Sequence, residues 1–252
     1  ASGSFDKQPR LWDVKTGESI LLEGHDKSVL ATAMSPDGSL VASGSLDEFI
    51  MLWDAKTHEL LKTFEGHSDN IYEIKFTPDG EHFVSVSRDK TVRLWSIEQE
   101  GIVKTYPGHR AGVMTVDISN DGNFMLTGSF DGEIKLWELA TSTEIYTFTQ
   151  HEKAITGVRF SPDFEKFASS SMDETAIIWD LNKKLFVDYH SEEAFLKELE
   201  QSNLFAPRQN NESRSDYKLR GEKAAMYKKE LYKKYFQEYL SELNQKKSQF
   251  LK

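Results

Sequence analysis

Tryptophan recurs along this chain at a nearly constant interval. The five tryptophans lie 41, 42, 42 and 42 residues apart, and each precedes Asp, Glu or Ser: Trp12, Trp53, Trp95, Trp137 and Trp179. A histidine keeps the same interval, 28 residues before each of the last four tryptophans: His25, His67, His109 and His151. A fixed period of this length predicts a repeat architecture in which similar small units stack on one another.

Each repeat is expected to form a small antiparallel sheet. In one repeat, apolar and polar residues alternate over 71–76 and 82–87, and further strand patterns follow at 91–95 and 102–106. Pro78-Asp79-Gly80 provides a turn between the first two strands. The residue before the tryptophan is apolar in every full repeat, which predicts a column buried between stacked sheets: Leu52, Leu94, Leu136 and Ile178.

The Gly-His and Trp-Asp pairs at this spacing resemble the WD-repeat β-propeller family. The resemblance implies an all-β fold, a WD-repeat β-propeller, here with four complete four-stranded blades and one partial blade, followed by a C-terminal α-helical extension. The expected blades lie within residues 1–190, at about 1–22, 23–64, 65–106, 107–148 and 149–190. Because the family most often has seven blades, we interpret the chain as the C-terminal part of a longer propeller that lacks about two blades plus a strand. The alternative is a partner chain that completes the ring.

Every full repeat also carries His, Ser and Asp at fixed spacing before its tryptophan. The sets are His25, Ser45, Asp47 and Trp53; His67, Ser87, Asp89 and Trp95; His109, Ser129, Asp131 and Trp137; His151, Ser171, Asp173 and Trp179. Ser, His and Asp are the groups of a serine hydrolase, but catalysis needs one special site, and no Gly-x-Ser-x-Gly elbow is present. The resemblance implies structural tetrads, in which the indole bonds Ser, Ser bonds His and His bonds Asp. We therefore expect no catalytic residue and no enzyme.

The composition narrows the remaining functions. The chain has no cysteine, and we expect no metal site, no cofactor and no small-molecule substrate. It has no secretory signal and no apolar run long enough for a membrane span. An intracellular protein is predicted, in the cytoplasm or the nucleus, with a cytoskeletal location left open.

The resemblance also implies where a partner protein would bind, on the top face around the channel mouth. Two positions in each repeat supply this face: the residue before the tetrad Asp, and the residue five after the tetrad His. Here they are Phe5, Leu46, Arg88, Phe130 and Met172, and Leu30, Tyr72, Met114 and Thr156. Apolar residues in tight turns with one Arg have the composition of a binding hot spot, although neighbouring loops could instead cover them.

The regular interval stops after Trp179. We expect a short flanking helix at 191–205, a linker at 206–215 and a long basic amphipathic helix at 216–252. Residues 214–252 carry a net charge of +6, whereas the rest of the chain carries −16. The apolar stripe of the long helix is the predicted partner-binding surface: Tyr232, Phe236, Tyr239, Leu243 and Phe250. Three interpretations stay open: the helix lies on its own propeller, it docks a partner or a coiled coil, or its lysines contact nucleic acid or tubulin.

The sequence thus favours a non-catalytic protein–protein interaction scaffold, a subunit of a multiprotein complex whose C-terminal helix docks a partner. One alternative is a peptide-recognition module, such as a ubiquitin-ligase substrate receptor or a chromatin-tail reader. The other is a structural subunit of a ribonucleoprotein or of a cytoskeletal or axonemal assembly.

Overall fold

The computed structural model divides into two compact units, Ala1–Trp179 and Asp180–Lys252. Within them it describes residues 1–99, 101–181, 197–198, 201–206, 213, 215–224, 226–227, 230–231, 234–235 and 238. Among the described residues the strands lie in the first unit, the last of them ending at Asp180, and the second unit contains helical residues and one 3-10 turn.

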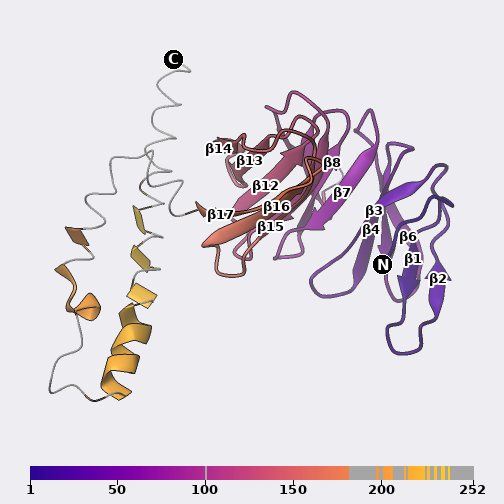
Figure 1. Cartoon of the computed structure of the whole chain (residues 1–252). Helices are drawn as coiled ribbons and strands as arrows, with labels where there is room; N and C mark the ends of the chain where they lie inside the picture. The colour runs from indigo at the N-terminus through magenta and orange to yellow at the C-terminus, as the bar shows by residue number, and fades with distance from the viewer. Residues whose placement is uncertain are drawn as a thin grey trace. The chain divides into compact units, whose positions relative to one another are not determined.

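The strands of the first unit form five separate antiparallel sheets, which follow one another in chain order (Figure 1). We call them blades 1 to 5. Blade 1 holds β1 (Arg10–Trp12) and β2 (Ser19–Leu21). Blade 2 holds β3 (Val29–Met34), β4 (Leu40–Ser45), β5 (Ile50–Asp54) and β6 (Leu60–Phe64). Blade 3 holds β7 (Ile71–Phe76), β8 (His82–Ser87), β9 (Val92–Ser96) and β10 (Ile102–Tyr106).

Blades 4 and 5 repeat the same order. Blade 4 holds β11 (Val113–Ile118), β12 (Phe124–Ser129), β13 (Ile134–Glu138) and β14 (Thr143–Phe148). Blade 5 holds β15 (Ile155–Phe160), β16 (Lys166–Ser171) and β17 (Ala176–Asp180). The predicted all-β blade architecture is therefore confirmed, with three four-stranded sheets among the described residues. The end of the fifth predicted blade, residues 182–190, lies outside the described residues.

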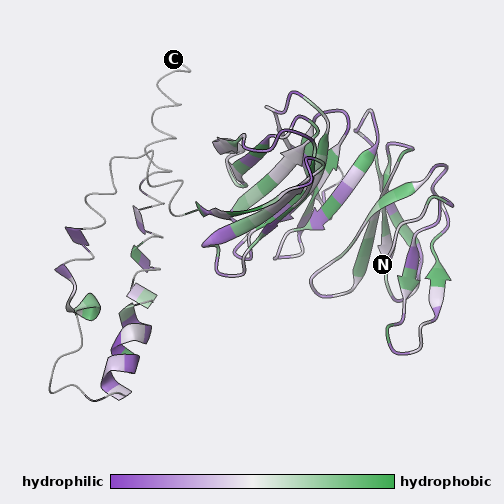
Figure 2. Cartoon of the chain, viewed as in Figure 1, coloured by the Kyte–Doolittle hydropathy of each residue, from purple (hydrophilic) through white to green (hydrophobic). Residues whose placement is uncertain are grey.

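The hydrophobic core lies between successive blades. One cluster joins Val84, Val86 and Leu94 of blade 3 to Val116 and Met125 of blade 4. Figure 2 shows the apolar residues concentrated along the strands. Each blade buries one face of its sheet against the next, so that stability is shared between repeats.

The column before the tryptophans shows this dependence on a neighbouring blade. Leu52, Leu94 and Leu136 are 1%, 7% and 0% exposed, whereas Ile178 in β17 is 77% exposed. Within the described part of the first unit, no further sheet packs on this face of blade 5.

The turns between the first and second strands follow one pattern. In β7–β8, Asp79 Oδ1 accepts hydrogen bonds from the Thr77 hydroxyl and the Glu81 amide, at 2.6 and 2.9 Å. Gly80 follows with a φ of 73°, a left-handed value that glycine adopts without steric cost. The carboxylate therefore holds the turn, as an Asx residue does in many tight turns.

Candidate functional site

The recurring His, Asp and Trp residues form buried hydrogen-bond chains in three blades. In blade 2, Trp53 Nε1 donates to Ser43 Oγ at 2.9 Å, and His25 Nε2 lies 2.8 Å from the same oxygen. His25 Nδ1 lies 2.8 Å from Asp47 Oδ2. Blades 3 and 5 repeat this arrangement with the following residues: Trp95, Ser85, His67 and Asp89, and Trp179, Ser169, His151 and Asp173.

The prediction of the tetrad serine was wrong: the residue that accepts the indole N–H lies two positions before the predicted one. Ser45, Ser87 and Ser171 do not bond the indole. Their hydroxyls accept an amide of the following turn and donate to a carbonyl of the loop before the first strand of the blade. Ser45 Oγ, for example, accepts the Asp47 amide at 3.1 Å and donates to the Lys27 carbonyl at 3.1 Å. Two residues along a strand point to the same face of the sheet, and both columns carry hydroxyls throughout, so spacing alone could not choose between them. The prediction of Ser129 in blade 4 was wrong for the same reason, since Trp137 Nε1 donates to Thr127 Oγ1 at 2.8 Å.

These groups are placed for structure rather than for nucleophilic attack. Ser43 and Ser85 are 0% exposed, and each hydroxyl is already held between an indole and an imidazole. Burial lowers the pKa of His67, which the hydrogen bond to Asp89 opposes. Burial alone would raise the pKa of Asp89, but hydrogen bonds from His67 and Thr91 outweigh it and hold the pKa below its ordinary value. The pair therefore consists of a carboxylate and a neutral imidazole near pH 7.

The tetrad of blade 4 departs from the others at its histidine. His109 Nε2 lies 2.7 Å from Thr127 Oγ1, as expected, but His109 Nδ1 is buried without a hydrogen-bond partner. Asp131 instead accepts the Glu133 amide at 3.1 Å. The predicted link from His109 to Asp131 is thus absent.

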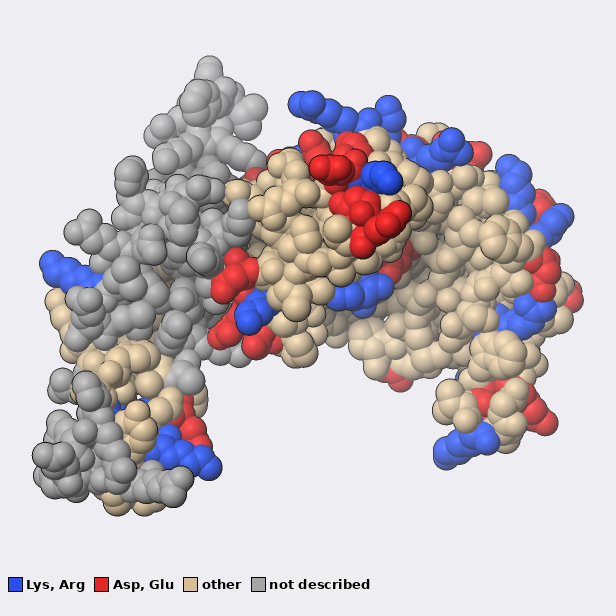
Figure 3. All heavy atoms as spheres, in the orientation of Figure 1, with Lys and Arg blue, Asp and Glu red and all other residues tan. Residues whose placement is uncertain are grey.

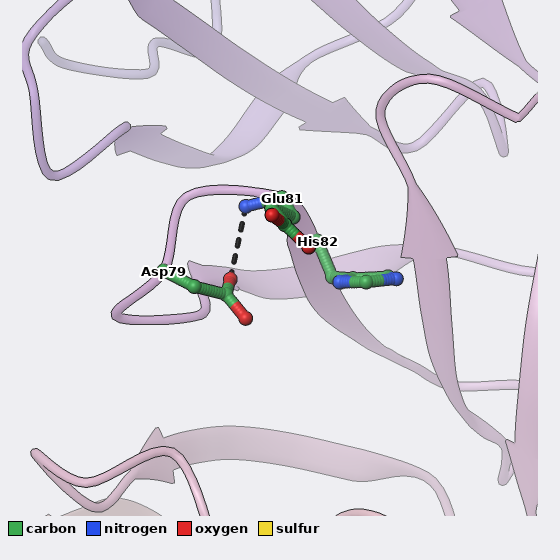
Figure 4. Close-up of side chains that lie close together, drawn as sticks. All are labelled: Asp79, Glu81 and His82. Carbon is green, nitrogen blue, oxygen red and sulfur yellow. Dashed lines mark hydrogen bonds between the residues drawn. The ribbon is translucent and has the colours of Figure 1, made fainter.

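A second group of titratable residues lies on the β7–β8 turn. Asp79, Glu81 and His82 bring ligand-type atoms within 4.8 Å of one another. Figure 4 shows that Asp79 is bonded to the Glu81 amide, so this carboxylate is part of the turn. Asp79 and His82 also border a cavity of about 280 Å³ with Leu94, Asp121 and Leu139. Both acids of the group are exposed, and we assign it no role.

The predicted interaction positions gather at one end of the sheets, which we call the top face. Pairing of Val29 with Ser45 places the start of an inner strand beside the β4–β5 turn, and the other blades repeat this register. Among the turn positions, Phe5, Phe130 and Met172 are 81%, 37% and 52% exposed. Arg88 and Thr156 are also exposed, and four positions are half-buried: Leu30, Leu46, Tyr72 and Met114.

Three of these residues lie together across blades 3 and 4. The rings of Tyr72 and Phe130 meet edge to face, with centroids 5.5 Å apart. Gly112 lies between Arg88 and Phe130, since a Cβ on this glycine would be 3.0 Å from both Arg88 Cα and Phe130 Cδ2. We call Tyr72, Arg88 and Phe130 the top-face patch.

Charged residues on the inner strands join the blades, a feature that the sequence analysis missed. Lys75 of β7 lies 3.0 Å from Asp117 of β11, whose Oδ2 accepts the Phe160 amide of β15 at 2.8 Å. The sequence holds a sign of these charged contacts. Blade 3 has Glu73 and Lys75 at the positions where blade 2 has the small residues Ala31 and Ala33. Figure 3 shows acidic and basic side chains interspersed over the visible surface of this unit.

Only part of the second unit lies among the described residues, so the structure bears on only some of the predictions for it. The predicted stripe of Tyr232, Phe236, Tyr239, Leu243 and Phe250 lies outside the described residues. Residues 215–224 are helical, and the 3-10 turn η1 spans Asn203–Phe205. Among the described residues, none forms a helix long and apolar enough to cross a bilayer.

The described helical residues of the second unit contact residues 198–206 of the same unit. Arg220 donates to the carbonyls of Leu204 and Ala206, at 3.2 and 2.6 Å. Tyr235 donates its hydroxyl to Glu198 at 2.8 Å, and Lys234 lies 3.1 Å from the same carboxylate. These bonds lower the pKa of Glu198. One face of the helical region is therefore occupied within its own unit.

Comparison with protein families gives one match. Four segments of the chain match the family model "WD domain, G-beta repeat", at residues 18–54, 58–96, 101–138 and 142–180. A comparison with curated proteins finds no match. The matched segments cover more than half of the chain, and each ends at the second residue of a Trp-Asp, Trp-Ser or Trp-Glu pair.

Proposed function

Because the chain belongs to the WD-repeat family, we propose that its blades form a non-catalytic scaffold that binds a partner protein through the top-face patch. WD-repeat domains generally serve as protein-interaction scaffolds. The observation that carries the proposal is the edge-to-face pair of half-buried Tyr72 and exposed Phe130, with Arg88 beside it. Aromatic residues and Arg are the side chains that contribute most to binding at protein interfaces.

The position of the patch supports an interface role. Phe130 lies in a tight turn, where a polar residue would normally face water, and its ring is 37% exposed. Its amide donates to the Gly112 carbonyl at 2.9 Å, and the corresponding bond fixes Arg88 to Asn70 at the same distance. The patch is thus held by backbone hydrogen bonds before a partner arrives, which lowers the entropy lost on binding.

The C-terminal helix is proposed as a second docking element of the same complex. Two binding elements on one chain raise the effective concentration of each partner for the other. Lys234 is already paired with Glu198, which leaves this lysine less available to an acidic polymer. This pairing favours a partner that binds the apolar stripe of the helix over contact of its lysines with nucleic acid or with the acidic surface of tubulin.

The test compares partners captured by the wild type with those captured by three variants. Phe130→Ala with Arg88→Ala should remove a set of partners that a matched control, Val103→Ala, retains. Val103 is also exposed, at 43%, but lies on the outer strand β10. A version ending at Ser213 reports separately on the helix. Loss of partners in the Val103 variant alone would place docking on the outer edge and contradict the proposal.

A further inference from the structure

The histidine of blade 4 is buried with one ring nitrogen unpaired. His109 is 7% exposed, and its Nδ1 has no hydrogen-bond partner, whereas Nε2 is held by Thr127 at 2.7 Å. In the other full blades, the corresponding Nδ1 lies 2.7–2.8 Å from the tetrad Asp. An unpaired buried polar atom is costly and calls for an explanation.

Two carboxylates face this ring. One ring nitrogen of His109 and one oxygen each of Asp131 and Glu133 lie within 4.8 Å of one another. Because Nε2 is engaged by Thr127, Nδ1 is the atom available to the group. Donors of this kind, one imidazole nitrogen and two carboxylate oxygens, are common ligands of Zn²⁺.

Glu133 is the residue that makes this blade different. The same position holds Thr91 in blade 3 and Thr175 in blade 5, and each threonine hydroxyl lies 3.3 or 3.2 Å from the histidine Nδ1. These hydroxyls also bond the tetrad Asp, at 2.7 and 2.6 Å. In blade 4 a carboxylate stands at this position and the His–Asp bond is absent, whereas blade 2, with Phe49 there, keeps that bond.

Charge around the group is only partly balanced. Lys135 Nζ lies 3.7 Å from Glu133 but 3.1 Å from Glu144 and 2.9 Å from Thr147, so its closer carboxylate is Glu144. Asp131, Glu133 and Glu144 therefore give three negative charges beside one lysine. In the tautomer that carries its proton on Nε2, a neutral His109 ring has a free electron pair on Nδ1.

We propose that His109, Asp131 and Glu133 bind a divalent transition-metal ion, with Zn²⁺ as the best-fitting ion. Ligand distances near 2.0–2.2 Å require these donors to close modestly around the ion, with water completing the coordination. Thr127 orients the imidazole through its other nitrogen, as hydrogen-bond partners of ligand histidines do in zinc sites. Phe130 directly precedes Asp131, so the ion would also fix the turn that carries Phe130.

The test is zinc titration of the full chain by calorimetry, after treatment with a chelator. We expect one specific site in the wild type, and at least a tenfold loss of affinity in Glu133→Thr. This variant restores the threonine of blades 3 and 5, so its fold should be retained, as circular dichroism would show. A matched control, His82→Asn, alters the other His-acid group and should bind zinc as the wild type does.

A second readout locates the ion on the proposed nitrogen. The ¹⁵N chemical shift of His109 Nδ1 should change on addition of zinc, while that of His67 Nδ1 should not. Absence of zinc binding, unchanged affinity in Glu133→Thr, or loss of binding in His82→Asn would each overturn the proposal. Its failure would leave the proposed partner interface untouched, because the variants that test that interface alter none of the three proposed ligands.

Discussion

The carboxylate of Glu73 in blade 3 accepts a hydrogen bond from Arg159 in blade 5, with an Nη2–Oε1 distance of 2.6 Å. Its other oxygen accepts the Val116 amide of blade 4 at 2.8 Å. Arg159 Nη1 in turn donates to the Val116 carbonyl at 3.2 Å. One side chain thus joins the inner strands of three successive blades.

Replacement of Glu73 should separate the two contributions of this carboxylate. Glu73→Ala leaves the Val116 amide without a partner and should lower the free energy of unfolding by about 1–3 kcal/mol. Glu73→Gln keeps an acceptor and loses only the ion pair to Arg159, whose side chain is 53% exposed, so the expected cost is about 0–1 kcal/mol. Urea denaturation measures both. Equal losses would show that the ion pair, not the amide bond, joins the blades.

Ser43 and Ser45 should differ in their effect on Trp53. Ser43→Ala removes the acceptor of the buried indole N–H and should cost about 1–3 kcal/mol. It should also shift the indole N–H resonance of Trp53. Ser45→Ala removes bonds to the backbone of Asp47 and Lys27 and should leave that resonance in place. A shifted indole signal in Ser45→Ala alone would restore the spacing-based assignment.

The strands could be predicted from sequence because their signals are local. The predicted strands at 71–76 and 82–87 coincide with β7 and β8, and the third is displaced by one residue. Each limit is set by a few consecutive residues: apolar and polar residues alternate along the strand, and turn residues such as Pro78-Asp79-Gly80 end it.

Contacts between blades could not be predicted in the same way. Glu73 and Arg159 are 86 residues apart, and no local pattern relates them. The exposure of Ile178 depends on whether a further sheet packs on blade 5, although its column in the sequence matches Leu52, Leu94 and Leu136. The unpaired Nδ1 of His109 occurs in a repeat whose tetrad spacing is regular, so the spacing gave no sign of it.

Acid should destabilise the blades through His67 and Asp89. The folded-state pKa of each group lies below its ordinary value, 6.5 for the histidine and 3.8 for the aspartate. The unfolded chain therefore binds more protons as pH falls, and stability is lost with decreasing pH, first below about 6.5 and then below about 3.8. Each group can contribute a slope of up to about 1.4 kcal/mol per pH unit.

The measurement for this effect is the free energy of unfolding between pH 7.5 and pH 4.5 with a chelator present. His67→Asn should flatten the slope relative to wild type, because one buried neutral imidazole is removed. His58, which belongs to no tetrad, provides the matched control, and His58→Asn should leave the slope unchanged. An identical slope in wild type and His67→Asn would contradict the assignment.

Two glycines should respond in opposite directions to alanine. A Cβ on Gly128 of β12 would lie 2.4 Å from Ile155 Cγ2, and Ile155 belongs to the next blade and is 0% exposed. Gly128→Ala should therefore force blades 4 and 5 apart and cost about 1–3 kcal/mol.

Gly221 lies within helical residues 215–224 and has no atom within 4 Å of the corresponding Cβ. Gly221→Ala should stabilise that helix by about 0.5–1 kcal/mol, since alanine loses less backbone entropy. Thermal melts followed at a β-sheet wavelength report on the first variant and the helical circular dichroism signal on the second. Stabilisation by Gly128→Ala would mean that the two blades pack less closely than the structure shows.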